Sequence, residues 1–136
     1  MSRSYAREVV LKTIFQLDFY EDESKEKYLE HIKRFKLNKL DSEYSVGMIT
    51  QIYDNKENID DIINKYLVNW DTKRLNLMEL SILRLATYEI IKRKDIPIPV
   101  SISEAINFTI KYSEKESVKY INAVLEKVAK GDESIG

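Results

Sequence analysis

The chain has 136 residues, with 22 basic and 23 acidic side chains, one histidine, three glycines, two prolines and no cysteine. These counts exclude disulfides, thiolate metal sites, sites with two histidine ligands and glycine-rich phosphate-binding loops. The longest uncharged run, residues 44–53, is half of the roughly 20 residues that a membrane-spanning helix needs, and the charged N-terminal segment is unlike a secretory signal. What remains is a soluble, cytosolic, helix-rich domain without a membrane span, and the composition argues against an enzyme.

Helices are expected throughout, because glycine and proline together make up only five of the 136 residues. Sandwiches and barrels need frequent turns, so this composition favours an all-α fold. Apolar residues at 3.6-residue spacing predict a first helix over residues 4–20 and an amphipathic second helix over 24–37. A third helix is predicted to be capped by Asp41 or Ser42, and a fourth to begin at Asn58.

Residues 75–94 differ from the earlier segments, because apolar side chains surround most of the helix that they predict. A loop over 68–74, with Trp70 as its anchor, is expected before it. Four polar residues of the helix fall within one sector about 140° wide. These are Asn76, Glu79, Arg84 and Thr87. We expect a central helix exposed only along this polar stripe, and a buried partner for Glu89, which falls on the apolar side.

Two prolines within 97–99 end the central helix and predict an extended connector, because residues before proline avoid the helical region. Two later serines each stand three residues before a glutamate, which is the spacing of a capping box. The pairs Ser101–Glu104 and Ser113–Glu116 therefore predict the starts of the last two helices.

The whole pattern predicts about seven helices in a single domain of residues 1–136. We expect two packed helical subdomains within it. The first covers residues 1–68 and the second 69–130, and residues 131–136 are expected to form a frayed tail.

No group of residues in the sequence predicts catalysis. The acidic clusters stand in highly charged segments, where carboxylates are ordinarily solvated. His31 lies between Glu30 and Ile32 on a charged helix and is expected at the surface. Neither feature places a nucleophile beside a base.

Charge is distributed unevenly along the chain. Residues 73–94 carry six basic against two acidic side chains, whereas 21–30 carry two basic against five acidic ones. A nearly neutral chain can therefore still present a basic face to nucleic acid. Lys119 and Tyr120 place a cation beside an aromatic ring, the combination with which proteins bind RNA phosphates and stack on bases. A core tyrosine and an ordinary surface lysine would give the same pattern, so both interpretations stay open.

Several short motifs follow one another along the chain. They are Ala6-Arg7-Glu8 with Ile14-Phe15, Trp70-x-x-x-Arg74-Leu75, Glu79-x-x-Ile82-Leu83-Arg84-Leu85-Ala86-x-Tyr88-Glu89, Ile96-Pro97 with Val100-x-Ile102-x-Glu104-Ala105-Ile106, and Ser117-x-Lys119-Tyr120-Ile121-Asn122-x-Val124-Leu125-Glu126. In this order and spacing they resemble the signature of the NusB family. The resemblance covers residues 3–20 and 66–128, whereas 21–65 are similar only as helices.

This resemblance implies an all-α transcription antitermination factor built of two helical subdomains. Members of the family pair with NusE, a small-subunit ribosomal protein, and the heterodimer binds boxA RNA in ribosomal RNA transcripts. RNA polymerase in the elongation complex then reads through terminators. The resemblance implies no catalysis, no cofactor and no metal.

The resemblance also implies a binding surface near the N-terminus and on the central helix. Arg3 and Arg7 belong to an arginine-rich start that contacts RNA phosphates. Phe15 stands at an exposed aromatic position near both RNA and NusE. Glu79 stands where the family has an acidic residue at that surface, and its place on the polar stripe agrees with exposure. Arg84 and Glu89 are expected to be structural.

A second implied surface lies at the start of the last helix. It comprises Glu116, Lys119, Tyr120 and Asn122. Tyr120 would stack on a base, Lys119 would meet a phosphate, and Glu116 would restrain affinity in favour of selectivity.

The chain departs from the family pattern at three places. Its arginine-rich start holds only Arg3 and Arg7, so we expect weak RNA binding by the chain alone, with NusE supplying the rest. Ser103 stands where the family usually has asparagine, and Ala123 where it usually has glycine.

The sequence also leaves three alternatives open. The near-neutral charge is also compatible with a protein-interaction module that makes no direct RNA contact. The same fold resembles the N-terminal domain of ribosomal RNA cytosine methyltransferases, although no cofactor-binding half is present here. The nine tyrosines would also permit a homodimer.

Overall fold

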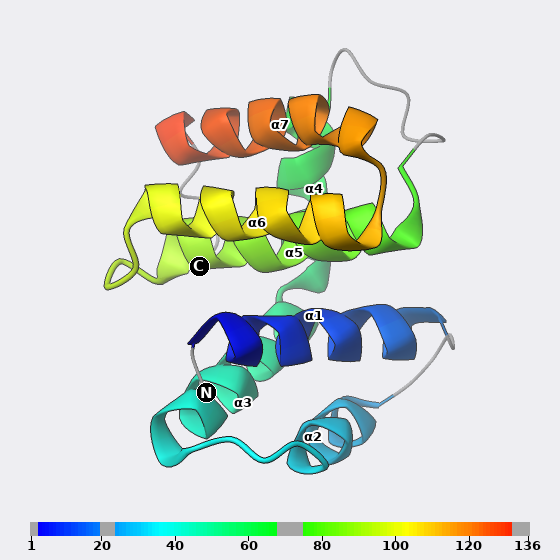
Figure 1. Cartoon of the computed structure of the whole chain (residues 1–136), viewed down its shortest axis with the longest axis vertical. Helices are drawn as coiled ribbons and strands as arrows, with labels where there is room; N and C mark the ends of the chain where they lie inside the picture. The colour runs from blue at the N-terminus through cyan, green and yellow to red at the C-terminus, as the bar shows by residue number, and fades with distance from the viewer. Residues whose placement is uncertain (1–2, 20–23, 68–74, 132–136) are drawn as a thin grey trace. The chain divides into compact units, whose positions relative to one another are not determined.

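The computed structural model describes residues 3–19, 24–67 and 75–131. Within these ranges it contains seven α-helices, one short 3-10 helix and no β-strand (Figure 1). The predicted all-α fold of about seven helices is therefore confirmed. No helix of the described ranges is long and apolar enough to cross a membrane.

The chain divides into two compact units, residues 1–54 and 55–136. The predicted boundary after residue 68 falls in a segment outside the described residues, as does the loop that Trp70 was expected to anchor. The observed division comes earlier, because the fourth helix packs against later helices of the second unit.

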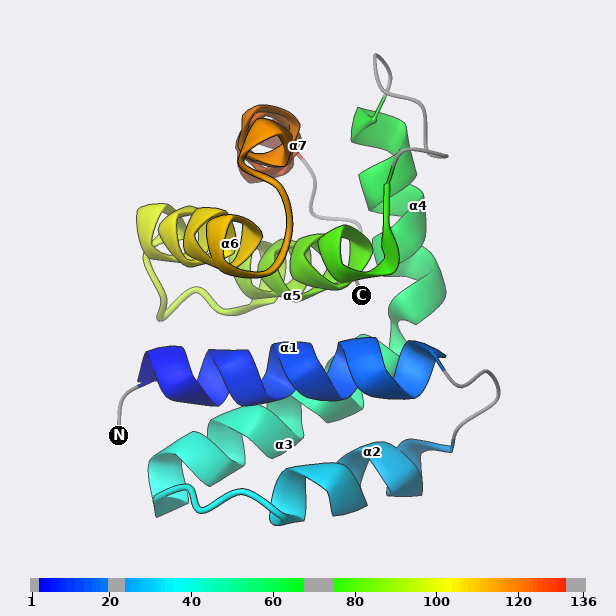
Figure 2. The ribbon, with the colours of Figure 1, turned by 45° about the vertical axis from the view of Figure 1, so that its right-hand side comes forward.

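The first unit consists of α1 (Arg3–Phe19), α2 (Lys25–Lys33) and α3 (Lys39–Asp54), each of which packs against the other two (Figures 1 and 2). Ser24, the first residue of the predicted second helix, is the N-cap of α2. The helix ends at Lys33, four residues before the predicted end at residue 37. The predicted caps of α3 are wrong. The side chain of Asn38 accepts the N–H of Asp41 at 2.8 Å instead, and Asp41 lies within the helix and pairs with Arg3.

Gly47 lies exposed in the middle of α3, and a Cβ added there meets no atom within 4 Å. Replacing Gly47 by alanine should raise the free energy of unfolding by about 0.5–1 kcal/mol, because alanine loses less backbone entropy in a helix. Urea unfolding followed by circular dichroism would measure the gain. Gly131→Ala is the control, since Gly131 is the last residue of α7 and should gain less. A loss of stability in Gly47→Ala would contradict the prediction.

The second unit consists of α4 (Lys56–Tyr66), α5 (Leu77–Lys92), α6 (Ile98–Tyr112), the 3-10 helix η2 (Lys115–Ser117) and α7 (Val118–Gly131). Helix α5 packs against α4, α6 and α7, and residues 81–91 are all buried. It is the central helix of this unit, as the sequence predicted (Figure 2).

The prediction that the polar stripe of α5 is exposed is wrong. Glu79 is 2% exposed, Arg84 5% and Thr87 0%, and of the four stripe residues Asn76 alone is exposed. Arg84 is buried because it forms a two-point ion pair with Asp60 of α4, through Nε at 2.7 Å and Nη2 at 2.8 Å. Its expected structural role agrees with this contact.

Glu89 has the buried partner that the sequence predicted. The hydroxyl of Ser101 donates to Glu89 Oε1 at 2.6 Å, and both residues are buried. Ser101 lies in the first turn of α6, so the carboxylate sits beside a helix N-terminus. The predicted capping box at Ser101 is therefore wrong, because α6 begins at Ile98, directly after Pro97.

Candidate nucleic-acid interface

The connection from α6 to α7 is organised around the carboxylate of Glu79. Glu79 Oε2 accepts hydrogen bonds from the hydroxyls of Ser113 and Ser117, both at 2.5 Å, and Oε1 accepts one from the hydroxyl of Tyr120. The three donors belong to the C-cap of α6, to η2 and to the first turn of α7. One buried carboxylate therefore ties three successive parts of the chain to the start of α5.

The start of α5 explains why Glu79 points at this connection. Asn76 is the N-cap, its side chain accepts the N–H of Glu79 at 2.8 Å, and its own N–H donates to Glu79 Oε1 at 3.3 Å. This is a capping box, with the same spacing as the one predicted at Ser113–Glu116. Ser113 instead ends α6, so the prediction at that pair is wrong. The Asn76–Glu79 pair has the same spacing and could have been found.

The surroundings of Glu79 favour its charged form. Burial by itself raises the pKa of Glu79, but the hydrogen bonds from Ser113, Ser117, Tyr120 and the Asn76 N–H outweigh it and hold the pKa below its usual value. Burial raises the pKa of the Tyr120 hydroxyl, and its hydrogen bond to Glu79 raises it further. Tyr120 therefore remains a hydrogen-bond donor to an ionised carboxylate.

The expected exposure of Tyr120 and Glu79 is corrected by this geometry. Tyr120 is 8% exposed and Glu79 is 2% exposed. In this conformation the tyrosine is part of the core, and its hydroxyl is directed inward to the carboxylate. The carboxylate of Glu79 likewise points inward, to the hydroxyls of Ser113, Ser117 and Tyr120.

Other predicted residues of this segment do lie at the surface. Glu116 and Lys119 are exposed, and Asn122 is half-buried. Glu114 and Lys115, which were not among the predicted site residues, are also exposed. We call Glu114, Lys115, Glu116 and Lys119 the connection surface.

The predicted arginines of the first unit have partners within that unit. Arg7 is 5% exposed, with its guanidinium 5.9 Å from the centre of the Tyr44 ring, so its expected exposure to RNA is corrected. Arg3 is half-buried, pairs with Asp41 at 2.9 Å and lies 4.4 Å from the centre of the same ring. Both arginines hold α1 to α3.

Phe15 is half-buried on α1, and a second aromatic residue accompanies it. Phe19 is 65% exposed, with its ring centre 6.5 Å from that of Phe15. Lys12 and Gln16 are exposed on the same side. We call Lys12, Phe15, Gln16 and Phe19 the α1 face. Phe19 was missed as a site residue, although 100° per residue places it with Lys12 and Phe15.

His31 is half-buried rather than fully at the surface. Its Nδ1 lies 2.8 Å from Thr13 Oγ1 and its Nε2 lies 2.9 Å from Gln16 Oε1, so its ring joins α2 to α1. Burial, with a smaller effect from Arg34, lowers its pKa. The Thr13 hydroxyl also donates to the Val9 carbonyl at 2.7 Å, within α1.

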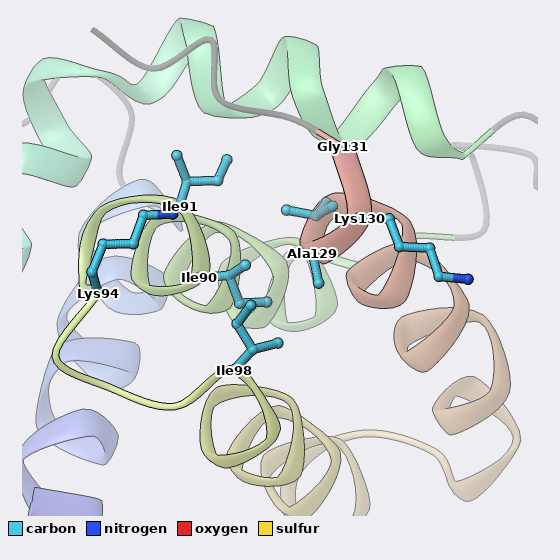
Figure 3. Close-up of a pocket in the computed structure, with 8 residues that line it drawn as sticks. Ile90, Ile91, Lys94, Ile98, Ala129, Lys130 and Gly131 are labelled. Atoms are coloured by element: carbon cyan, nitrogen blue, oxygen red, sulfur yellow. The ribbon is translucent and has the colours of Figure 1, made fainter.

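A cavity of about 170 Å³ lies at the other end of α5 from Glu79, between the ends of α5 and α7 and the start of α6 (Figure 3). Aliphatic residues, one glycine and two lysines line it. They are Ile90, Ile91, Lys94, Ile98, Val128, Ala129, Lys130 and Gly131. None of the predicted site residues lines it. In the described ranges, no group of three or more metal-ligating side chains is arranged to hold a metal ion.

Comparison with known proteins relates this arrangement to one family. The model of the NusB family matches residues 4–130. The transcription antitermination protein NusB of Acetivibrio thermocellus is 38% identical over 130 residues, which cover 96% of this chain and 90% of the relative. The structure of T. maritima NusB is 35% identical and superposes with a TM-score of 0.86, covering 96% of this chain and 92% of that one.

A further solved structure contains a similar chain in an assembly. It is a crystal structure of the antitermination factors NusB and NusE in complex with dsRNA. The similar chain is 27% identical, with a TM-score of 0.81, and the match covers 94% of this chain and 96% of that one.

Proposed function

This chain belongs to the NusB family, and from that premise we propose that it is an RNA-binding transcription antitermination factor that works as a pair with NusE. The proposal extends to boxA RNA in ribosomal RNA transcripts as the ligand. It also extends to read-through by RNA polymerase in the elongation complex as the outcome. The function is one of binding, without catalysis, and its place of action is the cytoplasm, where transcripts are made.

One observation carries this proposal. A chain of the same fold, similar over 94% of this one, is found with NusE and dsRNA in a solved complex. The family match over residues 4–130 supports it, because the match includes both units. Fold alone would not support a function, but here the sequence similarity runs along nearly the whole chain.

We place the RNA contacts on exposed and half-buried residues of each unit. In the second unit these are Glu116 and Lys119 of the connection surface, together with Asn122. In the first unit they are Phe15 and its neighbours on the α1 face, where a half-buried and an exposed aromatic ring accompany Lys12. Exposed rings beside a cation suit unpaired bases and phosphates. Arg7, Glu79 and Tyr120 are buried, and their contacts hold in place the helices that carry these surfaces.

The deciding experiment is a titration of labelled boxA RNA at fixed salt. The chain alone, NusE alone and the mixture are each titrated against boxA RNA and against a scrambled RNA of equal length. We expect weak binding by the chain alone and selective binding of boxA RNA by the mixture. Equal binding of the two RNAs by the mixture would contradict the proposal and would favour a protein-interaction module.

Replacing Lys119 by alanine should weaken binding of all RNAs by the mixture and should make the salt dependence about one unit less steep. One lost cation releases about one fewer counterion when RNA binds. Titrations at several salt concentrations measure this slope. Lys127→Ala is the matched control, because Lys127 is also exposed on α7 but lies two turns further along. An unchanged slope for Lys119→Ala, or an equal loss for both variants, would exclude Lys119 from the RNA surface.

A further inference from the structure

We propose that Glu79 is the positioning residue for the connection surface, and that it acts on RNA through the placement of Lys119 rather than by contact. This inference rests on the proposed function for its RNA part. Its structural part concerns the free chain and can be tested without RNA.

The pattern of burial along the connection carries the structural part. The residues that donate to Glu79, at 113, 117 and 120, turn inward, and Ser117 and Tyr120 are buried. The residues between them at 114, 115, 116 and 119 are exposed. The buried contacts with Glu79 therefore fix the positions of the exposed residues. Each exposed residue lies no more than two positions along the chain from a residue whose hydroxyl binds the carboxylate.

The connection has few backbone constraints of its own. Its backbone hydrogen bonds include short-range turns, such as Ser117 N–H to the Glu114 carbonyl at 2.9 Å and Val118 N–H to the Lys115 carbonyl. The contacts with Glu79 instead span 34, 38 and 41 residues along the chain. They anchor the connection to α5, which α4, α6 and α7 all contact.

The chemistry of the group explains why a carboxylate is needed here. An ionised carboxylate has about four acceptor positions on two oxygens and no donor. It can therefore receive three hydroxyls and one N–H, as Glu79 does. Glutamine has the same shape but a single acceptor oxygen, so its amide nitrogen would face hydroxyls that now donate.

An ordered connection matters for binding because a cation held in place before RNA arrives loses less conformational freedom on binding. Lys119 immediately precedes Tyr120, whose hydroxyl is bound by Glu79. If that anchor is lost, Lys119 must be ordered by the RNA itself. The effect of Lys119 on affinity then becomes smaller.

The structural part is tested by amide hydrogen exchange on the free full-length chain, comparing Glu79→Gln with Tyr120→Phe. Tyr120→Phe keeps the ring and removes one donor, so it reports on the anchor even if Glu79→Gln fails to fold. Glu126→Gln is the control, because Glu126 is exposed on α7. We expect amides of residues 117–120 to exchange at least about tenfold faster in both variants, with α4 protected as before. Unchanged exchange at 117–120 would overturn the proposal.

The RNA part is tested by a double-mutant cycle in the mixture with NusE, using boxA RNA. If Glu79 acts through Lys119, the loss of affinity caused by Lys119→Ala should be at most half as large, as a fold-change, in the Glu79→Gln or Tyr120→Phe background. Independent, multiplying losses would overturn the positioning role. A Lys119→Ala variant that binds like the parent would instead overturn the RNA surface proposed above, while the exchange experiment would still decide whether Glu79 orders the connection.

Discussion

Replacing Glu79 by alanine should lower the free energy of unfolding by about 3–5 kcal/mol, the largest effect that we expect from a single substitution in this chain. The change leaves the hydroxyls of Ser113, Ser117 and Tyr120 without their acceptor, and Ser117 and Tyr120 are buried. Each buried group without a partner costs about 1–3 kcal/mol. Urea unfolding followed by circular dichroism measures the loss, and Glu126→Ala, at an exposed position, should stay within about 0.5 kcal/mol.

The pH dependence of stability shows whether the charge of Glu79 is what stabilises the fold, and Glu79→Gln is the variant that tests this. The pKa of Glu79 is lowered in the folded chain, so its charge stabilises the fold above the ordinary value of 4.5, and this contribution is lost as the pH falls through the folded pKa. The difference in stability between the parent and Glu79→Gln should therefore be constant above about pH 5.5 and shrink below pH 4.5. A difference that does not change with pH would mean that the carboxylate contributes only through its shape.

Replacing Arg84 by alanine should lower the free energy of unfolding by about 2–4 kcal/mol, because it removes one partner of a largely buried ion pair together with the buried stem of the arginine side chain. The side chain of Arg84 is 6% exposed and that of Asp60 is 30% exposed. The partial exposure of Asp60 lets water solvate the remaining carboxylate, which keeps the loss below that for Glu79.

Arg93 provides a matched control for this second prediction. It also forms a two-point contact with an aspartate, Asp95, at 3.0 Å for both nitrogens, but the two side chains are 28% and 63% exposed. Arg93→Ala should therefore cost less than about 1 kcal/mol. Equal losses for Arg84→Ala and Arg93→Ala in urea unfolding would show that burial does not set the strength of these pairs.

The helices could be predicted from the sequence because their signal is local. Apolar periodicity identified α1 and the central α5, and the position of Glu89 correctly predicted a buried partner. The caps were harder, because several polar residues near each end have the right chemistry. Asn38 rather than Asp41 caps α3, and only the tertiary pairing of Asp41 with Arg3 separates the two.

The polar stripe of α5 could not be interpreted from periodicity alone. A helical pattern tells which residues share a side of one helix, but not whether a distant segment brings polar partners to that side. Asp60 lies 24 residues from Arg84, and the donors to Glu79 lie 34 to 41 residues away. Polar residues at such positions can be buried as readily as exposed when these partners are supplied.

The exposure of the residues in the candidate site could be predicted only in part. The segment 116–122 does contain exposed residues at Glu116 and Lys119. Tyr120 and Arg7 have the right chemistry for RNA, but the same chemistry also suits a buried hydroxyl donor or a guanidinium against a tyrosine ring. Residue type and spacing cannot separate these uses, because both place an aromatic or cationic group on one side of a helix.

The buried charges of the described residues change how the electrostatic character of the molecule should be understood. They are Arg7, Asp41, Glu79, Arg84 and Glu89. Two are basic and three acidic, so together they account for the formal net charge of −1, and twenty basic and twenty acidic residues remain. Long-range attraction to a polyanion such as RNA is therefore weak for this chain, and electrophoretic mobility near neutral pH should be low. An encounter with RNA then depends on small patches or on a basic companion protein.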